Sequence, residues 1–169
     1  MTDKVKRYRK PKEGDVFAIP LGELGYGFCQ VCKTGDFAFF DLVSADIASI
    51  EHVLDKSIAF RVPAAGEPVR EGAWSFLGNA PLRKGLDEPA LYRNQPVGSN
   101  QVYIVKGNER FPASVDEAKD LEVMSWWFVN QLVERLQDYF AGRPNREFES
   151  TRLIKKYDLL TGQEIKVGS

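Results

Sequence analysis

Three short apolar runs separated by turn signals occupy residues 15–42 and constrain the fold more than any other feature of the sequence. The runs are residues 15–21, 26–33 and 37–42, and the turns between them are residues 22–25 and 34–36. Short apolar segments bounded by glycine-containing turns are typical of antiparallel strands. The sequence therefore predicts a strongly curled, three-stranded meander.

Shorter segments downstream predict further strands and one short helix. Residues 45–54 carry apolar side chains at helical spacing, with Ser44 or Asp46 available as the N-cap, so a short helix is expected there. The prolines within residues 78–99 indicate an ordered loop with a brief helical turn near residues 89–92. Apolar runs bounded by turn residues predict three more strands, at residues 57–62, 74–77 and 102–105.

The longest helical pattern begins at a capping box. Ser114 is followed three residues later by Glu117, a spacing that satisfies the first backbone N–H groups of a helix. The pattern then runs to Ala141, with room for a kink near Leu121, and Gly142 suits the C′ position. We therefore predict one long helix in the C-terminal half of the chain.

These elements together predict an α+β fold, in which a curled antiparallel sheet, partly open and barrel-like, packs with one long C-terminal helix and one or two short helices. Residues 147–157 are predicted to form a last strand. We expect a basic flexible arm over residues 1–12, a single domain over residues 13–157 and an exposed tail over residues 158–169. No apolar stretch reaches 18 residues and no apolar signal segment follows the charged N-terminus, so a cytoplasmic location is expected.

Helical spacing places Trp127 on the polar side of the predicted helix, away from the apolar arc that runs from Leu121 to Phe140. A large aromatic side chain at such a position either packs under another part of the chain, which we favour, or is an exposed anchor for a partner. Arg135 lies at the edge of the apolar arc and is expected to form a structural ion pair. The polar neighbours of Trp127 on this face are Asn130, Gln131, Glu134, Gln137 and Asp138.

The residue types that carry most enzyme chemistry are sparse. Cys29 and Cys32 form a CxxC within a strand-like run, where side chains three apart point to opposite faces, so two small half-buried side chains are expected. His52 is the only histidine and has no evident catalytic partners. The two glycine-rich phosphate-binding patterns, GxxxxGK[ST] and GxGxxG followed by a helix, do not occur. The sequence therefore predicts no enzyme, no cofactor and no metal. A carboxylate site, the weaker alternative, would use the acids flanking the first strands: Asp15, Asp36, Asp41 and Asp46.

Charge is unevenly distributed along the chain. Residues 1–12 carry six basic side chains against Asp3, a net charge of +5, whereas residues 13–169 carry 17 basic and 23 acidic side chains, a net charge of −6. A basic arm and a curled sheet can bind nucleic acid, but an acidic body repels a polyanion. A nucleic-acid-binding module is therefore the alternative function.

Four stretches of the sequence together resemble one known family. They are EGDVFAIPL with GYGF in residues 13–28, IAFRV in 58–62, EGAWSFLGNAPL in 71–82 and LEVMSWWFVNQLVERLQDYFAGRPNRE in 121–147. Their order and spacing resemble immunity protein 26, a family of bacterial polymorphic toxin systems. The last stretch is the most specific part of the resemblance.

Within that last stretch, the family's tryptophan falls on Trp127, its RL pair on Arg135 and Leu136, and its FAGRPN on residues 140–145. The family pattern commonly continues to a histidine four residues after the tryptophan and an aromatic residue after RPN. In this sequence those places hold Gln131 and Phe148.

The resemblance implies an immunity protein that binds a cognate toxin domain and neutralises it by occlusion, without catalysis. An acidic body suits a partner that is often a basic nuclease, because opposite charge speeds association. The candidate contact surface combines the polar helix face with acids at the sheet edge. The candidate toxin-binding residues are Trp127, Asn130, Gln131, Glu134, Asp138, Asp36, Asp41, Asp46 and Glu51.

Overall fold

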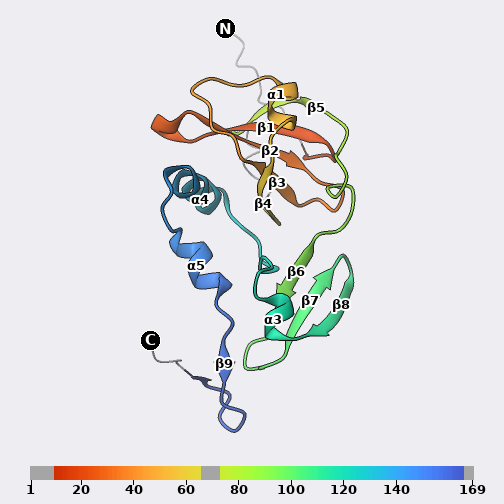
Figure 1. The fold of residues 1–169 in the computed structure, drawn as a ribbon, viewed down its shortest axis with the longest axis vertical. Helices are drawn as coiled ribbons and strands as arrows, with labels where there is room; N and C mark the ends of the chain where they lie inside the picture. The colour runs from red at the N-terminus through yellow and green to blue at the C-terminus, as the bar shows by residue number, and fades with distance from the viewer. Residues whose placement is uncertain (1–9, 66–72, 166–169) are drawn as a thin grey trace. The chain divides into compact units, whose positions relative to one another are not determined.

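The three apolar runs near the start of the chain form adjacent strands of a five-stranded antiparallel sheet in the computed structural model (Figure 1). The strand order is β4-β3-β2-β1-β5, and a 3-10 turn, η1 (Gly22–Leu24), connects the first two strands. The predicted meander is therefore confirmed. The strands are β1 (Asp15–Pro20), β2 (Tyr26–Val31), β3 (Phe37–Phe40), β4 (Ile58–Val62) and β5 (Ser75–Asn79).

The structure describes residues 10–65 and 73–165, and these residues fall into two compact units. The first unit contains the described residues up to Glu88 together with Ser125–Asn145. The second unit contains Pro89–Met124 and the described residues from Arg146 onward. Most of the basic arm, residues 1–9, lies outside the described residues, as do residues 66–72 and 166–169. A single domain over residues 13–157 stays a prediction.

Strands β1, β2 and β3 are buried along nearly their whole length, so both of their faces are covered, which explains why they are continuous apolar runs. Register shifts between Val16 and Phe17 and between Phe39 and Phe40 mark bulges that increase the local twist of the sheet. On one face, a buried cluster packs against the first helix, and it contains Val16, Ala18, Phe28, Phe40 and Val53. The mixed α+β class with a curled, open antiparallel sheet is confirmed.

The first helix is shorter than predicted. Helix α1 (Ile50–Leu54) begins after Ser49, whose hydroxyl accepts a hydrogen bond from the His52 N–H at 3.3 Å. The predicted cap at Ser44 is wrong, because Ser44 is held extended by two backbone hydrogen bonds with Tyr26, at 2.7 and 3.0 Å.

The long predicted helix is also interrupted, and only its ends are helical. Helix α3 (Val115–Ala118) starts at the predicted capping box, and α4 (Val129–Ala141) ends at Gly142 with φ at 69°, as expected of a C′ glycine. A continuous helix through residues 119–128 is wrong. Pairing with distant backbone replaces it there, since the Arg93 N–H donates to the Glu122 carbonyl at 2.9 Å and the Trp127 N–H donates to the Pro63 carbonyl at 3.0 Å.

The second unit contains a three-stranded antiparallel sheet with the order β6-β7-β8. Its strands are β6 (Leu91–Asn94), β7 (Val102–Lys106) and β8 (Glu109–Ala113). The predicted helical turn near residues 89–92 is wrong, because residues 91–94 pair with β7. Arg93 is buried and donates to the carbonyls of Lys119 and Arg152, which secures this sheet to the rest of the unit.

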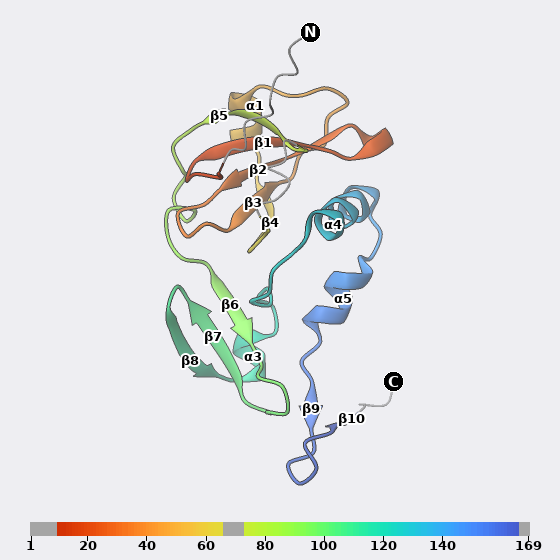
Figure 2. The ribbon, with the colours of Figure 1, turned by 180° about the vertical axis from the view of Figure 1, so that it is seen from behind.

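The predicted last strand is mostly a helix, α5 (Arg146–Arg152). Two glutamates in its first turn favour the positive end of the helix dipole, and Arg152 pairs with Glu149 one turn back at 3.6 Å. Figure 2 shows the short hairpin that follows, formed by β9 (Lys156–Tyr157) and β10 (Glu164–Ile165). None of the helices described here has the length and apolar character that crossing a bilayer requires.

Candidate functional site

The candidate toxin-binding residues all lie in the first unit, but they differ in exposure. Asp36 and Trp127 are buried, with 5% and 3% of their surface exposed. Gln131 and Asp138 are half-buried. The exposed candidates are Asp41, Asp46, Glu51, Asn130 and Glu134.

Trp127 lies in the core because its backbone is part of an extended pairing. Its N–H donates to the Pro63 carbonyl at 3.0 Å, and its carbonyl accepts from the Ala65 N–H at 2.9 Å. Above its ring, the Arg135 guanidinium carbon lies 4.7 Å from the ring centroid and also 3.8 Å from that of Phe60. This arrangement joins α4 to the end of β4 and places the tryptophan inside the unit.

Asp36 has a structural partner in Arg61 of β4. Its carboxylate accepts from the Arg61 Nε at 2.7 Å and from the Thr34 hydroxyl at 2.8 Å. The same guanidinium donates to the carbonyls of Gly85 and Glu88, at 2.9 and 2.8 Å. Asp36 therefore helps to hold the loop after β5 against the sheet.

The RPN exit from α4 forms a local closure around Asp138. Asp138 accepts from the Arg143 Nε at 3.2 Å and from the Asn145 amide at 3.0 Å. The Arg143 N–H also donates to the Asp138 carbonyl at 2.9 Å, which fixes the turn at Gly142. This motif therefore sets the end of the helix, and its side chains are used mainly within the unit.

Tyr139 of α4 lies close to Asp41, in the loop that follows β3. Burial raises the pKa of the Tyr139 hydroxyl, and the nearby negative charge of Asp41 raises it further. Asp41 and the exposed residues of α4 therefore belong to one region of the first unit. The exposed acids Asp46 and Glu51 lie further along the loop and in α1.

The acidity of the chain is concentrated in this unit. Residues 13–88 and 125–145 carry 14 acidic and 8 basic side chains, a net charge of −6. The second unit, residues 89–124 and 146–169, carries 9 of each and is neutral overall. The net negative charge of residues 13–169 therefore lies in residues 13–88 and 125–145.

Comparison with models of protein families assigns the sequence to a known family. The family model described as immunity protein 26 matches residues 12–102, which is more than half of the chain. The chain belongs to the immunity protein 26 family. No curated protein and no solved structure matches it.

The match covers the five-stranded sheet of this immunity protein 26 family member and continues to the first residue of β7. The tryptophan-containing stretch at residues 121–147 is the most specific part of the resemblance described above, and it lies outside the matched range. The family assignment therefore rests on the sheet and its connections.

The cysteines and the histidine are placed differently from catalytic groups. Cys29 and Cys32 are both fully buried, more so than the half-buried state expected. Burial raises the pKa of the Cys32 thiol to about 12 and that of Cys29 well above its ordinary value, so neither forms a nucleophilic thiolate near neutral pH. His52 lies exposed in the middle of the short helix α1.

The carboxylates flanking the first strands do not converge on one site. Asp15 is fully buried and accepts from the Asn79 amide at 3.0 Å, while Asp36 binds Arg61 and Asp46 is exposed. Within residues 10–65 and 73–165, no group of three or more histidine, cysteine, aspartate or glutamate side chains could hold a metal ion.

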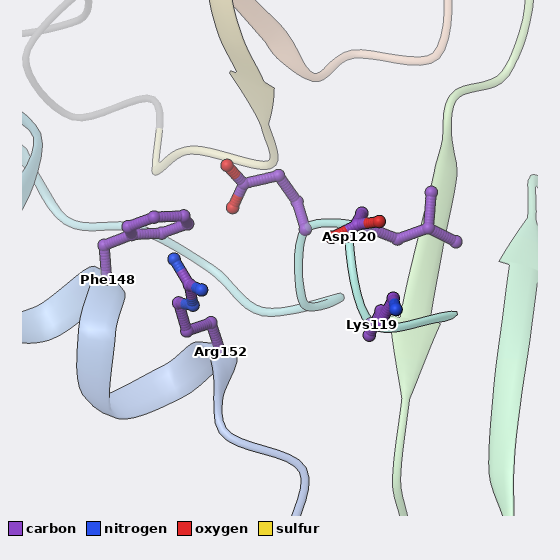
Figure 3. A pocket seen from close by; sticks show the side chains of 6 residues that line it. Lys119, Asp120, Phe148 and Arg152 are labelled. Atoms are coloured by element: carbon purple, nitrogen blue, oxygen red, sulfur yellow. The ribbon is translucent and has the colours of Figure 1, made fainter. Parts of the chain in front are cut away.

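Two small pockets lie within the second unit. Figure 3 shows the first, about 110 Å³ in volume, between α5 and the segment that follows α3. The second, about 160 Å³, is lined partly by Val97, Leu153 and Tyr157. Both are smaller than the ~300–1,000 Å³ that encloses a typical small-molecule ligand. The residues lining the first are Lys119, Asp120, Leu121, Glu122, Phe148 and Arg152.

Sequence reasoning missed two exposed aromatic side chains, Trp126 and Phe128. A helical spacing assigned Trp127 to the surface and treated its neighbours as core. In the extended segment, successive side chains point to opposite sides, so Trp127 is buried and its two neighbours are exposed. The signal that could have found them is the run SWWF itself, whose three consecutive aromatic residues cannot all be buried on one side of an extended strand.

Proposed function

We propose that the protein is an immunity protein that binds a cognate toxin domain in the bacterial cytoplasm and neutralises it by occlusion, without catalysis. Membership of the immunity protein 26 family carries this proposal. The buried thiols and the dispersed carboxylates support the non-catalytic part, because the side chains of Cys29, Cys32 and Asp36 are used within the fold.

The contact surface that fits this function lies on the first unit. Asp41, Asp46, Glu51 and Glu134 are exposed on this unit, which carries all of the net negative charge outside the N-terminal arm. A basic toxin, such as a nuclease, would be attracted to this unit and would have its nucleic-acid-binding surface covered. Trp127 and Asp36 are buried within the same unit.

The first experiment measures binding and protection together. The toxin domain encoded by the neighbouring gene is co-expressed with the protein, and growth and co-purification are recorded. We expect the protein to restore growth and to purify with the toxin in a stable complex. Unchanged toxicity, with no complex formed by the folded protein, would contradict the proposed function.

A matched pair of charge variants locates the surface. Asp46→Lys, Glu51→Lys and Glu134→Lys are combined in the first unit, where each residue is exposed. The control combines Glu109→Lys, Asp120→Lys and Glu164→Lys in the second unit, which are also exposed and change the net charge by the same amount. We expect the first variant to slow association with a basic toxin by about tenfold or more at low salt, and the control to slow it much less.

A further inference from the structure

Two large aromatic side chains next to α4 are exposed to solvent. Trp126 is 67% exposed and Phe128 is 58% exposed, whereas the other two tryptophans, Trp74 and Trp127, are each 3% exposed. A tryptophan is usually mostly buried, and exposed aromatic residues close together mark surfaces that bind partners. Trp126 and Phe128 are called the aromatic pair below.

The backbone fixes the direction in which the aromatic pair points. Trp127, between its two members, is bonded on both sides to the extended chain at Pro63 and Ala65, at 3.0 and 2.9 Å. Because side chains alternate along an extended segment, Trp126 and Phe128 point away from the buried Trp127. The pair is therefore held on the outer side of the segment.

Helix α4 fixes the second member of the pair. Phe128 is the N-cap residue of α4, and its N–H donates to the Gln131 Oε1 at 3.0 Å. Two aromatic rings on either side of the hydrogen-bonded backbone of Trp127 lose little freedom when a partner covers them, and this lowers the entropic cost of binding. The pair has the preorganised character of a binding anchor.

The charges around the pair indicate the chemistry of the partner. Helix α4, which begins directly after Phe128, carries the exposed acid Glu134, and residues 13–88 and 125–145 of this unit have a net charge of −6. The face of an indole ring also attracts lysine and arginine side chains. Both features fit a basic protein surface that combines cations with an apolar recess.

We propose that Trp126 and Phe128 are the principal anchor through which this protein binds its toxin, and that they contact a basic, partly apolar surface of the toxin. This proposal rests on the proposed function and specifies the contact. Trp127, one of the candidate contact residues from the sequence, is buried, and the proposal assigns it the role of holding its two neighbours in place.

The deciding experiment measures affinity for the toxin domain encoded by the neighbouring gene, by isothermal titration calorimetry. Wild-type protein is compared with Trp126→Ala, Phe128→Ala and Phe111→Ala. Phe111 is the matched control, because it is an exposed aromatic residue at 48% exposure on β8 of the second unit. Each variant is first checked for an unchanged melting temperature.

We expect Trp126→Ala to weaken binding by on the order of 30-fold or more, Phe128→Ala by about tenfold, and Phe111→Ala by less than about threefold. Tight wild-type binding that both anchor variants retain would overturn the anchor and leave the proposed function intact. A folded wild-type protein that does not bind the toxin would overturn the proposed function, and the anchor with it.

Tryptophan fluorescence tests the exposure of the anchor in the full chain. Because Trp74 and Trp127 are buried, acrylamide should quench a component that Trp126→Ala lacks, and bound toxin should protect this component. Absence of that component from the free wild-type protein would overturn the proposal. Protection that instead develops with protein concentration, together with a dimer mass in light scattering, would assign the surface to a second copy of the chain and overturn it as well.

Discussion

The guanidinium carbon of Arg135 lies 4.7 Å from the ring centroid of Trp127, inside the first unit. The same guanidinium stacks on Phe60 at 3.8 Å, and only 6% of Arg135 is exposed. A cation placed over an aromatic ring away from water contributes about 2 kcal/mol or more. Arg135 therefore connects α4 to β4 and to the extended segment, and the position of the exposed aromatic pair depends on this contact.

Replacement of Trp127 should destabilise the protein much more than replacement of the adjacent Trp126. Trp127→Ala removes a buried ring and the surface on which Arg135 stacks, so the free energy of unfolding should fall by about 3–5 kcal/mol. Trp126→Ala removes an exposed ring and should change it by less than about 0.5 kcal/mol. Urea unfolding followed by circular dichroism measures both, and equal losses would contradict the assignment of core and surface.

The ion pair between Asp36 and Arg61 should be important for stability because it is buried. Asp36→Asn leaves the Arg61 guanidinium without its charged partner, so the free energy of unfolding should fall by about 3–5 kcal/mol. The control is Arg143→Ala, which breaks an ion pair with Asp138 in which the arginine is 63% exposed, and which should cost at most about 1 kcal/mol. Thermal unfolding of both variants checks this difference, and a loss for Asp36→Asn no greater than the control's would argue against it.

Much of the first unit could be predicted from sequence because its signals are local. Apolar runs, glycine turns and the C′ position of Gly142 each act within a few residues, and the structure confirms them. The broken helix at residues 119–128 could not be predicted in this way. Its backbone pairs with Pro63, Ala65 and Arg93, which are far away in sequence, and such long-range pairing overrides local helical spacing.

The candidate site shows the same difference between local signals and long-range contacts. The exposed acids were found because net charge is a property of the sequence itself, and Asp46 and Glu51 are indeed at the surface. Asp36 was grouped with them, since nothing in its local sequence indicates that Arg61 would bury it. Trp126 and Phe128 are exposed, contrary to the helical spacing, because the segment that contains them is extended and not helical.

Gly25 should be hard to replace because of its backbone conformation and its surroundings. Its φ is 97°, and a Cβ at this position would lie 2.2 Å from the carbonyl oxygen of Ser44. Gly35 has a similar φ of 84° but open space around it, so Gly35→Ala isolates the conformational cost of about 1–2 kcal/mol. Gly25→Ala should cost a further ~1–3 kcal/mol for the clash, measured by urea unfolding. Equal costs for the two substitutions would mean that the backbone near Ser44 yields without penalty.

The buried thiols should make the protein less stable in alkaline solution. Burial raises the pKa of Cys32 to about 12, and the pKa of Cys29 is raised by burial and by the neighbouring Cys32. A thiol in the unfolded chain has a pKa of about 8.5, so above that pH the unfolded state loses protons that the folded state keeps. The contribution of each thiol to stability is therefore fully present below about pH 8.5 and is lost as the pH rises toward the folded pKa.

Cys32→Ala isolates this effect from the ionisation of lysine and tyrosine side chains, which both proteins share. Between pH 9 and pH 11, the free energy of unfolding of the wild type should fall more steeply than that of the variant, by about 1.4 kcal/mol per pH unit. Urea unfolding at several pH values in this range, under reducing conditions, gives both slopes. Parallel slopes would mean that the Cys32 thiol ionises as readily in the folded protein as in the unfolded chain, against its burial between β2 and the turn that follows.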